Sequence, residues 1–257
     1  MGYSLDWEKL DREILSSFPE EYSVVDYWGR VVDRTHVKRY LAQGRKRVEL
    51  LFGVIAESAP PGSKVLEVGT AYGMILFALR EAGYDVCGSD LPESIEYYST
   101  PLVDAGIQVI PWDMHREWPS DIEMFDVVIA SEVLEHLQVS LNTAVEKLSR
   151  LLRPGGWLVI TTPNIYSLPD IIKILNGENI NEPFPDEPAI KNNIVVDSRT
   201  HPREPAMKEL LHSLKHNGLV VKKKTYFTSG KRHPMKELIF ALSPRRFNSN
   251  LLGVFKE

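Results

Sequence analysis

The feature that most constrains the fold is the stretch from Lys64 to Asp90, where a strand, a glycine-bearing turn, a helix and a second strand follow one another. The same alternation continues downstream. Further strands are indicated at 108–111, 125–130 and 157–162, and helices at 92–105 and 139–152. Strands that alternate with helices form a mostly parallel sheet with helices on both faces. We therefore predict an α/β fold with a doubly wound, mostly parallel sheet.

The strands themselves have the composition of a covered sheet. Both faces are apolar in FDVVIA (125–130) and in WLVIT (157–161), whereas a strand with one face in water alternates apolar and polar residues. The chain has 257 residues, which is long enough to bury a sizeable core. A helix at 204–216, a strand at 219–228, a short helix around 235–242 and a last strand at 250–257 complete the predicted order.

Two segments lie outside this alternation. Residues 1–60 carry apolar side chains near helical spacing, interrupted at Gly44, so we predict a helical N-terminal cap there. Residues 165–200 are rich in Pro, Asn and Asp, and a loop of that length in a compact domain is usually functional or disordered. We therefore expect one main domain at 61–257 with an insertion around 165–200.

Charge and cysteine content exclude several classes of function. The formal net charge of −5 gives no general attraction for nucleic acid, so we expect no such partner. The single cysteine, Cys87, rules out a disulfide framework and a multi-cysteine zinc site. The start, MGYSLDWEKLDREIL, is too charged for a signal peptide, and no apolar run approaches the ~20 residues of a membrane span. We expect a soluble, cytoplasmic protein.

The turn after the first predicted strand, Gly69–Gly73, lies where open α/β sheets bind ligands. Its glycines allow close backbone approach, and the next helix directs its N-terminus to the same place. However, the dinucleotide fingerprint G-x-G-x-x-G is absent, and Met74 stands where a phosphate-binding loop has lysine. Glu67 would repel a pyrophosphate. A ligand with a positive amino group and no phosphate suits this turn better.

Five segments, in this order, carry a resemblance to a known family: VLEVGTAYG, VCGSDLPES, VIPWDMHREW, FDVVIASEVLEHL and LSRLLRPGGWLVITTPN. Over residues 45–257 the chain resembles the class I, seven-stranded S-adenosylmethionine-dependent methyltransferases, in their small-molecule, ubiquinone-type branch. It departs from their first motif at Ala71, which replaces a glycine. The resemblance implies S-adenosylmethionine as cofactor and the strand order 3-2-1-4-5-7-6 with the last strand antiparallel. It also implies a lid formed by the N-terminal helices and the insertion.

The resemblance assigns contacts to this cofactor. Asp90 would accept hydrogen bonds from both ribose hydroxyls, and Leu91 would pack against the adenine. Asp113 would meet the adenine amino group, and Met114 would make a ring or amide contact. Taken alone, Asp90 is equally compatible with a helix cap, and Asp113 alone is a weaker signal still. The remaining predicted contacts, at the turn and the methionine end, are Glu67, Gly69, Thr70, Ala71, Gly73, Ser131 and Glu132.

The methyl acceptor is less constrained than the donor. Transfer is an in-line displacement in which the protein mainly positions the two molecules, although an oxygen or nitrogen acceptor can need a base. His136, after the fourth predicted strand, is our candidate base because its ordinary pKa suits proton transfer. Helix capping or packing on the cofactor loop is the alternative role for this histidine.

Several further residues are candidates for acceptor binding. His201 and Arg203 lie in HPREP, which is similar to the H-x-R-E-[YF] start seen in the ubiquinone-type and sugar-modifying branch, with proline in place of the aromatic residue. A plain helix start explains the same residues, since an acid there complements the helix dipole. Tyr27, Trp28 and Tyr166 are candidate walls of the acceptor site, and ordinary packing is the alternative for each.

The expected activity is methylation of a small molecule. Oxygen is the favoured acceptor atom, in a sugar, a glycan precursor or a secondary metabolite, and the basic segment 30–47 would suit an acidic or sugar-linked acceptor. N-methylation, a dehydrogenase, and a non-catalytic cofactor-binding domain serving a protein partner remain alternatives. We find no convincing set of metal ligands and expect no metal, and we expect a monomer or a homodimer.

Overall fold

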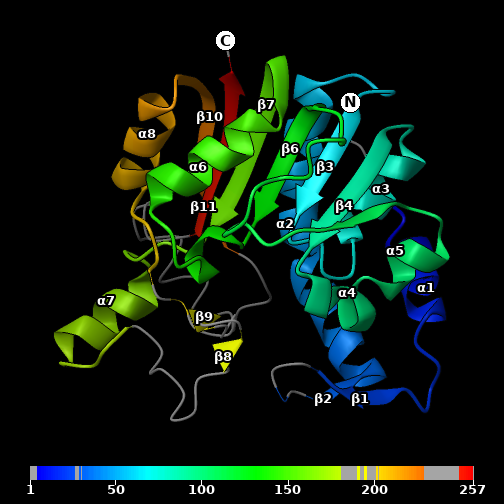
Figure 1. The fold of residues 1–257 in the computed structure, drawn as a ribbon. Coiled ribbons are helices and arrows are strands. Elements are labelled where there is room, and N and C mark those ends of the chain that lie inside the picture. Colours follow the sequence, from blue (N-terminus) through cyan, green and yellow to red (C-terminus); the bar gives the residue numbers. More distant parts are fainter. Residues whose placement is uncertain are drawn as a thin grey trace.

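The computed structural model describes residues 5–26, 29, 31–180, 190–191, 194–195, 201, 203–228 and 249–256. Its centre is a seven-stranded sheet (Figure 1). In chain order the strands are β3 (Lys64–Val68), β4 (Asp85–Asp90), β5 (Val109–Pro111), β6 (Phe125–Ser131), β7 (Leu152–Thr162), β10 (Leu219–Phe227) and β11 (Ser249–Lys256). Across the sheet they run β10-β11-β7-β6-β3-β4-β5, which, counted from the other edge, confirms the predicted order 3-2-1-4-5-7-6.

Strand direction divides the sheet into two parts. The five strands from β7 to β5 pair in parallel, whereas β11 pairs antiparallel with both β7 and β10. The predicted antiparallel last strand is thereby confirmed. In the parallel part, Val68 of β3 lies level with Ser89 of β4 and with Ala130 of β6. These three strands therefore end at the same edge of the sheet.

Helices cover both faces of the sheet, as Figure 1 shows. Successive residues of β6 belong to two different cores: Val127 and Ile129 to one, Val128 and Ala130 to the other. The first core also contains residues of α1 (Trp7–Ser16), α2 (Arg34–Ser58) and α3 (Met74–Glu81), and the second those of α6 (Leu141–Arg150) and α8 (Met207–His216). The apolar character of both strand faces, which the sequence shows, is explained by this double covering.

The N-terminal segment contains more than helices. A two-stranded antiparallel ribbon, β1 (Ser23–Val25) and β2 (Val31–Asp33), separates α1 from α2. The prediction of a mostly helical segment misses this ribbon because strands of three residues carry almost no periodic signal. α2 also runs through Gly44 without a break. A Cβ at Gly44 would lie 2.8 Å from the sulfur of Met74, so glycine is what lets α2 pack closely on α3.

Two helix predictions need adjustment. The helix predicted over 92–105 is divided into α4 (Pro92–Tyr98) and α5 (Thr100–Asp104). The helix predicted from residue 204 begins at Met207, because Ala206 is still in extended backbone. The strand predicted from residue 157 begins earlier, because β7 starts at Leu152, at a register shift against β6.

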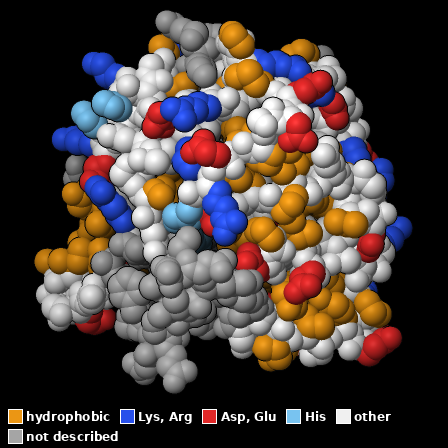
Figure 2. Space-filling view, in the orientation of Figure 1, with side chains coloured by type: hydrophobic (Ala, Val, Ile, Leu, Met, Phe, Trp, Pro, Cys, Tyr) orange, Lys and Arg blue, Asp and Glu red, His pale blue; other side chains and the backbone are white. Residues whose placement is uncertain are grey.

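The predicted insertion contains α7 (Leu168–Leu175) and two-residue strands β8 (Ile190–Lys191) and β9 (Ile194–Val195). Ile172, Ile174 and Leu175 of α7 are exposed. Figure 2 shows hydrophobic side chains at the lower left edge of the view, where Figure 1 places α7. The same view shows basic and acidic side chains interspersed. The short helix predicted around 235–242 lies outside the described residues. None of the helices within the described ranges is long and apolar enough to cross a membrane.

Candidate functional site

The C-terminal ends of β3, β4 and β6 bring three of the predicted site residues together. Because these strands end in register, Gly69, Asp90 and Ser131 follow at one level of the sheet edge. Ligands of open α/β sheets bind outside this edge, next to the point where the order of the strands reverses. Here that point lies between β3 and β6, which pair with each other although α3, β4, α4, α5 and β5 lie between them in the chain.

The turn after β3 is held by its backbone and by close packing. The Gly69 amide donates a hydrogen bond to the carbonyl of Ser89 at 2.8 Å. Gly69 and Gly73 have left-handed φ angles of 73° and 70°. A Cβ on Gly73 would lie 2.3 Å from the side chain of Leu102, and one on Gly69 would lie 2.5 Å from that of Val133. Both glycines are therefore required by conformation and by space.

Ala71, which stands where the related motif has a glycine, also has a left-handed φ angle, 45°. A residue with a Cβ is strained in this region by about 1 kcal/mol. The conformation directs the Ala71 amide at Asp90, and its N–H donates to Oδ2 at 3.0 Å. The backbone at Ala71 therefore has the conformation of the glycine that it replaces. The resulting hydrogen bond links the turn after β3 to the acid at the end of β4.

Asp90 is fixed from two sides. Besides the bond from Ala71, its Oδ1 accepts from the amide of Leu91 at 2.8 Å. Burial raises the pKa of Asp90, and the two backbone amides act in the opposite direction by stabilising the carboxylate. The side chain is half-buried. The carboxylate oxygens of Asp90 have further lone pairs, and the two backbone hydrogen bonds fix the direction of these lone pairs. The predicted contact with the ribose hydroxyls requires acceptors of this kind.

Glu67 is the buried acid of the site. It is 6% exposed, and its Oε2 has no hydrogen-bond partner among the described residues. Burial raises the pKa of Glu67 well above its ordinary value, and the positive charge of Arg47 acts in the opposite direction. A buried, incompletely paired carboxylate is costly unless a cation reaches it. The site therefore contains an acid whose ionised form a bound cation would stabilise.

Helix α2 adds residues that the sequence did not point out. The ring of Tyr40 packs edge-on against Tyr72 of the turn, with centroids 4.9 Å apart. Burial raises the pKa of Tyr40, and the charge of Arg47 lowers it. Arg47 ends the basic segment 30–47 of the sequence, but its side chain is half-buried and its charge interacts with Glu67 and Glu132. The signal was present in the spacing of 40, 44 and 47, which places Tyr40, Gly44 and Arg47 on one helical face.

The predicted adenine contacts have different surroundings. Asp113 Oδ1 accepts from the backbone amide of His115 at 2.9 Å and lies 2.7 Å from the Nδ1 of the same residue. Met114 is 4% exposed and belongs to the core that also contains Trp112. Leu91 is half-buried against the first core. Asp113 and Leu91 thus lie at the surface of the site, whereas Met114 is part of the core beneath it.

The end of β6 turns sharply at Glu132, whose φ angle is 56°. Its amide donates to the carbonyl of Thr161 at 2.8 Å, and the hydroxyls of Ser131 and Thr161 lie 2.9 Å apart. The Oε1 atom of Glu132 is buried and has no hydrogen-bond partner among the described residues. Left-handed backbone at a residue with a Cβ is uncommon and tends to occur at functional sites.

A cluster of one carboxylate and two imidazoles follows Glu132. A 3-10 helix, η1 (Leu134–His136), carries Glu135 and His136, and His201 joins them from the segment before α8. One ligand atom of each side chain lies within 4.8 Å of the other two. Glu135 is 1% exposed, and both burial and the charge of Glu132 raise its pKa. The sequence pointed to both histidines separately, but not to Glu135 or to their meeting.

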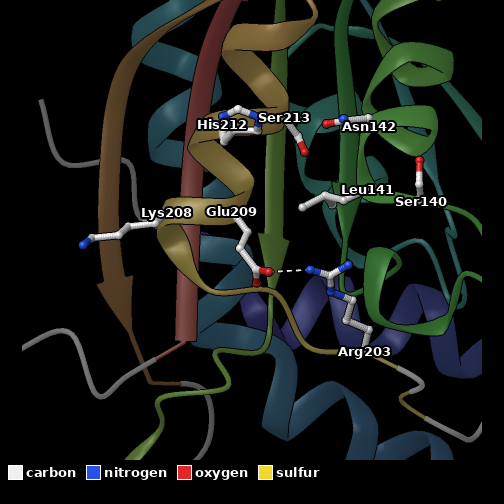
Figure 3. A pocket seen from close by; sticks show the side chains of 8 residues that line it. All are labelled: Ser140, Leu141, Asn142, Arg203, Lys208, Glu209, His212 and Ser213. Atoms are coloured by element: carbon white, nitrogen blue, oxygen red, sulfur yellow. Dashed lines mark hydrogen bonds and ion pairs between the residues drawn. The ribbon is translucent and has the colours of Figure 1, made fainter.

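The other predicted acceptor residues are not part of this cluster. Arg203 is exposed and forms an ion pair with Glu209 in a cavity of about 360 Å³ between α6 and α8 (Figure 3). Tyr166 follows β7 and is 56% exposed. Tyr27 and Trp28 lie outside the described residues. Arg203 and Tyr166 therefore remain predictions as acceptor contacts, and no contact between either residue and the cluster supports them.

Comparison with known proteins identifies the fold and the sequence family. A family model described as a methyltransferase domain matches residues 34–224. Among solved structures, magnesium protoporphyrin IX methyltransferase from Synechocystis, crystallised with S-adenosylhomocysteine, superposes with a TM-score of 0.58 at 15% identity. That superposition covers 97% of this chain and 94% of the other. It shows that the two chains share a fold.

Curated relatives are similar over about half of this chain. The mitochondrial ubiquinone biosynthesis O-methyltransferase of Rattus norvegicus is 33% identical over 125 residues, 46% of this chain and 36% of the rat protein. The ubiquinone biosynthesis O-methyltransferase of Bordetella avium is 29% identical over 126 residues, 46% of this chain and 50% of that protein. The chain thus spans half or less of the length of these two relatives.

Proposed function

The chain belongs to the methyltransferase-domain family, and from that premise we propose that it transfers a methyl group from S-adenosylmethionine to a hydroxyl of a small molecule. One observation carries the choice of cofactor: two acids, Glu67 and Asp90, flank a turn with glycine-like backbone and no phosphate-binding lysine. A dinucleotide would bring a pyrophosphate next to Glu67, whereas S-adenosylmethionine brings an ammonium and a sulfonium.

The cofactor would lie across the ends of β3 and β4. The ribose hydroxyls would donate to Asp90, whose carboxylate is already oriented by two backbone amides. The methionine end would extend toward β6, where Glu67 supplies a buried acid and Glu132 a carboxylate oxygen with no described partner. The adenine would lie between Leu91 and Asp113. In this placement the methyl group points toward η1, which carries His136.

The acceptor is proposed to be a small molecule with a free hydroxyl. The curated relatives are named as O-methyltransferases, which supports oxygen over nitrogen. A sugar, a glycan precursor or a secondary metabolite is the finer proposal. The early basic segment supports an acidic acceptor weakly, because Arg34 and Arg45 already form ion pairs with Glu20 and Asp11. His136 would lie beside the acceptor, as a base for its proton.

Calorimetric titration of S-adenosylhomocysteine tests the cofactor site. Asp90→Ala is expected to weaken binding at least ~30-fold, because hydrogen bonds to a charged group contribute about 1.5–3 kcal/mol. Asp85→Ala is the matched control, since Asp85 is exposed at the opposite end of the same strand. The affinity of the Asp85 variant for S-adenosylhomocysteine should stay within about 2-fold of wild type. Equal binding by the Asp90 and Asp85 variants would contradict the proposed site, and thermal stabilisation by NAD in place of S-adenosylhomocysteine would favour a dehydrogenase.

Turnover separates an enzyme from a binding domain. The full chain would be incubated with methyl-labelled S-adenosylmethionine and a metabolite extract, and labelled products would be separated by chromatography. We expect methyl ethers that are stable to acid and base. Labelled amines would favour the N-methyltransferase alternative. Release of no labelled product by a protein that binds S-adenosylhomocysteine would favour a cofactor-binding domain that serves a partner.

A further inference from the structure

The cavity between α6 and α8 lies outside the proposed cofactor site. Its lining comes from the first turn of α6, from the segment that leads into α8 and from α8 itself (Figure 3). None of the described lining residues is among those assigned to the cofactor. Its volume of about 360 Å³ corresponds to roughly twelve water molecules at about 30 Å³ each. The cavity is therefore larger than a bare ion needs and reaches the lower end of the range for small-molecule sites.

Two polar side chains face this cavity without a partner. Ser213 on α8 is 4% exposed. Among the described residues, hydrogen bonds from Asn217 reach the carbonyl of Ser213, but none reaches its hydroxyl. The Oδ1 atom of Asn142 on α6 is buried and also has no partner in the described part of the chain. Figure 3 shows both side chains directed into the space between the two helices. Because a buried polar group without a partner is costly, the pair indicates a molecule that bonds to both.

The first turn of α6 adds backbone donors. Ser140 accepts from the amides of Thr143 and Ala144, whereas the amides of Leu141 and Asn142 have no acceptor among the described residues. A helix of ten residues such as α6 has a partial positive charge at this end. Unpaired amides and a positive helix end together favour the oxygen atoms of an anion.

Arg203 adds a cation to the same lining. Its side chain is exposed and pairs with Glu209 through one nitrogen, which leaves its other N–H groups without a partner in the described ranges. Glu209 is satisfied from two sides, because the Ala206 amide also donates to its Oε2 at 2.9 Å. The Ala206 amide and Arg203 lower the pKa of Glu209, so this acid stays ionised and paired. Lys208 points away from the cavity in Figure 3. The groups that remain available are therefore mostly donors.

We propose that this cavity binds a small metabolite that carries a phosphate or a carboxylate group. An oxyanion only accepts hydrogen bonds, so it matches the free amides, the Ser213 hydroxyl and the Arg203 guanidinium. The Asn142 amide would turn about its Cβ–Cγ bond to present Nδ2. Leu141 supplies an apolar wall, and the remaining volume accommodates a short carbon body beside the oxyanion. The site itself is independent of the proposed methyl transfer.

A short segment connects the cavity with the acceptor half. Arg203 is followed by Glu204, whose Oε1 lies 2.8 Å from the Nδ1 of His201. The ring of His201 packs edge-on against that of His136, with centroids 4.8 Å apart. A ligand that draws Arg203 away from Glu209 would shift this segment, so we expect occupancy of the cavity to change the rate of methyl transfer. This step, unlike the site, rests on the proposed function.

Nuclear magnetic resonance titration of the full chain tests the site. Glycerol 3-phosphate is the phosphate probe and glutarate the carboxylate probe, with sodium chloride holding the ionic strength constant. Saturable shifts of the Leu141 and Asn142 amides are expected, and the tighter probe identifies the oxyanion. Arg203→Ala should weaken binding of that probe at least ~10-fold, because a charge-assisted hydrogen bond is lost. Arg150→Ala is the matched control and should bind within about 2-fold, because Arg150 pairs with Glu146 at the other end of α6.

Ser213→Ala separates a ligand contact from a structural role. Loss of the hydroxyl should weaken binding of the probe about 5-fold, while the melting temperature without ligand stays equal or rises, because an unpartnered polar group is removed. Ser149→Ala is its control: Ser149 is also buried, on α6, but its hydroxyl donates to the carbonyl of Glu146 at 2.8 Å. This variant should lose stability and keep its affinity for the probe.

Three results would overturn the site. They are the absence of saturable shifts with either probe, equal affinity of the wild type and Arg203→Ala, and shifts that chloride reproduces at the same ionic strength. Thermal unfolding of each variant shows that the fold is intact. Titration with S-adenosylhomocysteine separates the two proposals. A chain that binds a probe but not S-adenosylhomocysteine fails the proposed function alone, and one that binds S-adenosylhomocysteine but neither probe lacks the cavity site alone.

Turnover tests the connection to the acceptor half. Saturating probe should change the rate of methyl transfer by the wild type at least ~5-fold, in the range of ordinary coupling between two sites. The same concentration should leave the rate of Arg203→Ala within about 2-fold, because the variant binds the probe weakly. A wild-type rate that the bound probe does not change would overturn the connection.

Discussion

The two halves of the site are built in different ways. The donor half, from Glu67 to Asp90, is one continuous strand–turn–helix–strand unit whose geometry is set by backbone hydrogen bonds and by glycine conformation. The acceptor half joins side chains that are far apart in the sequence, such as Glu135 and His201. Local backbone geometry tolerates few substitutions, whereas side chains on separate segments can change one at a time. We infer that the donor half resists change and that the acceptor half accommodates it.

The largest expected effect lies in the donor half. Gly73→Ala places a Cβ 2.3 Å from Leu102 at a left-handed φ, whereas Gly106→Ala has a similar φ of 71° with no atom within 4 Å. The first should lose about 3 kcal/mol of unfolding free energy, from overpacking and conformation together, and the second about 1 kcal/mol from conformation alone. Urea denaturation measures both values. Equal losses would mean that the turn is not limited by packing.

Glu67→Gln tests the buried acid. Affinity for S-adenosylmethionine should fall about 10-fold because a charge partner of the ammonium is removed, while the melting temperature without ligand should rise about 2–4 °C because an incompletely paired carboxylate is no longer buried. Calorimetry and thermal unfolding measure the two quantities. A variant that loses both affinity and stability would indicate a structural role for Glu67.

The raised pKa of Glu67 also fixes the direction of the pH dependence. A carboxyl whose folded pKa lies above its unfolded pKa stabilises the fold below the unfolded value, and that contribution is lost as the pH rises through the folded value. The empty wild-type protein should therefore gain stability from this group as the pH falls, while its affinity for the cationic cofactor declines. The Gln variant should lack both trends.

Thr162→Val addresses the acceptor half with a change of nearly constant volume. Loss of the hydroxyl that donates to Glu135, the neighbour of His136, should lower the rate of methyl transfer about 10-fold and leave S-adenosylhomocysteine affinity within about 2-fold. Turnover assays and calorimetric titration measure the two quantities. A fall in both to the same extent would show that the two halves are coupled.

The smallest effect is expected at Ala71. Ala71→Gly removes the cost of a left-handed residue with a Cβ, so the unfolding free energy should rise by about 0.5–1 kcal/mol, less the greater entropy of glycine in the unfolded chain. Cofactor affinity should stay within about 2-fold, since the backbone amide that donates to Asp90 is unchanged. Denaturation and calorimetry measure both. A marked rise in affinity would mean that alanine distorts the turn.

The same contrast explains how far the sequence could predict the structure. The β3–turn–β4 unit and the order of the seven strands follow from local periodicity and from motif order, and the structure confirms them. The ribbon of β1 and β2 is too short to produce a period. Glu135 was hidden because its partner His201 is brought near only by tertiary structure, and Arg47 because a charged residue on a basic helix is ordinarily solvated.

The position of β11 has a consequence for how the protein comes to be folded. This strand lies between β7 and β10, so β10 joins the sheet only through a segment that follows it in the chain. On the ribosome, residues 219–227 are synthesised before their only bridge to β7 exists, and the edge of β7 stays open for the same time. Long-range pairings of this kind form slowly. The β7 edge is thus the place where a nascent chain would most need protection from pairing with another chain.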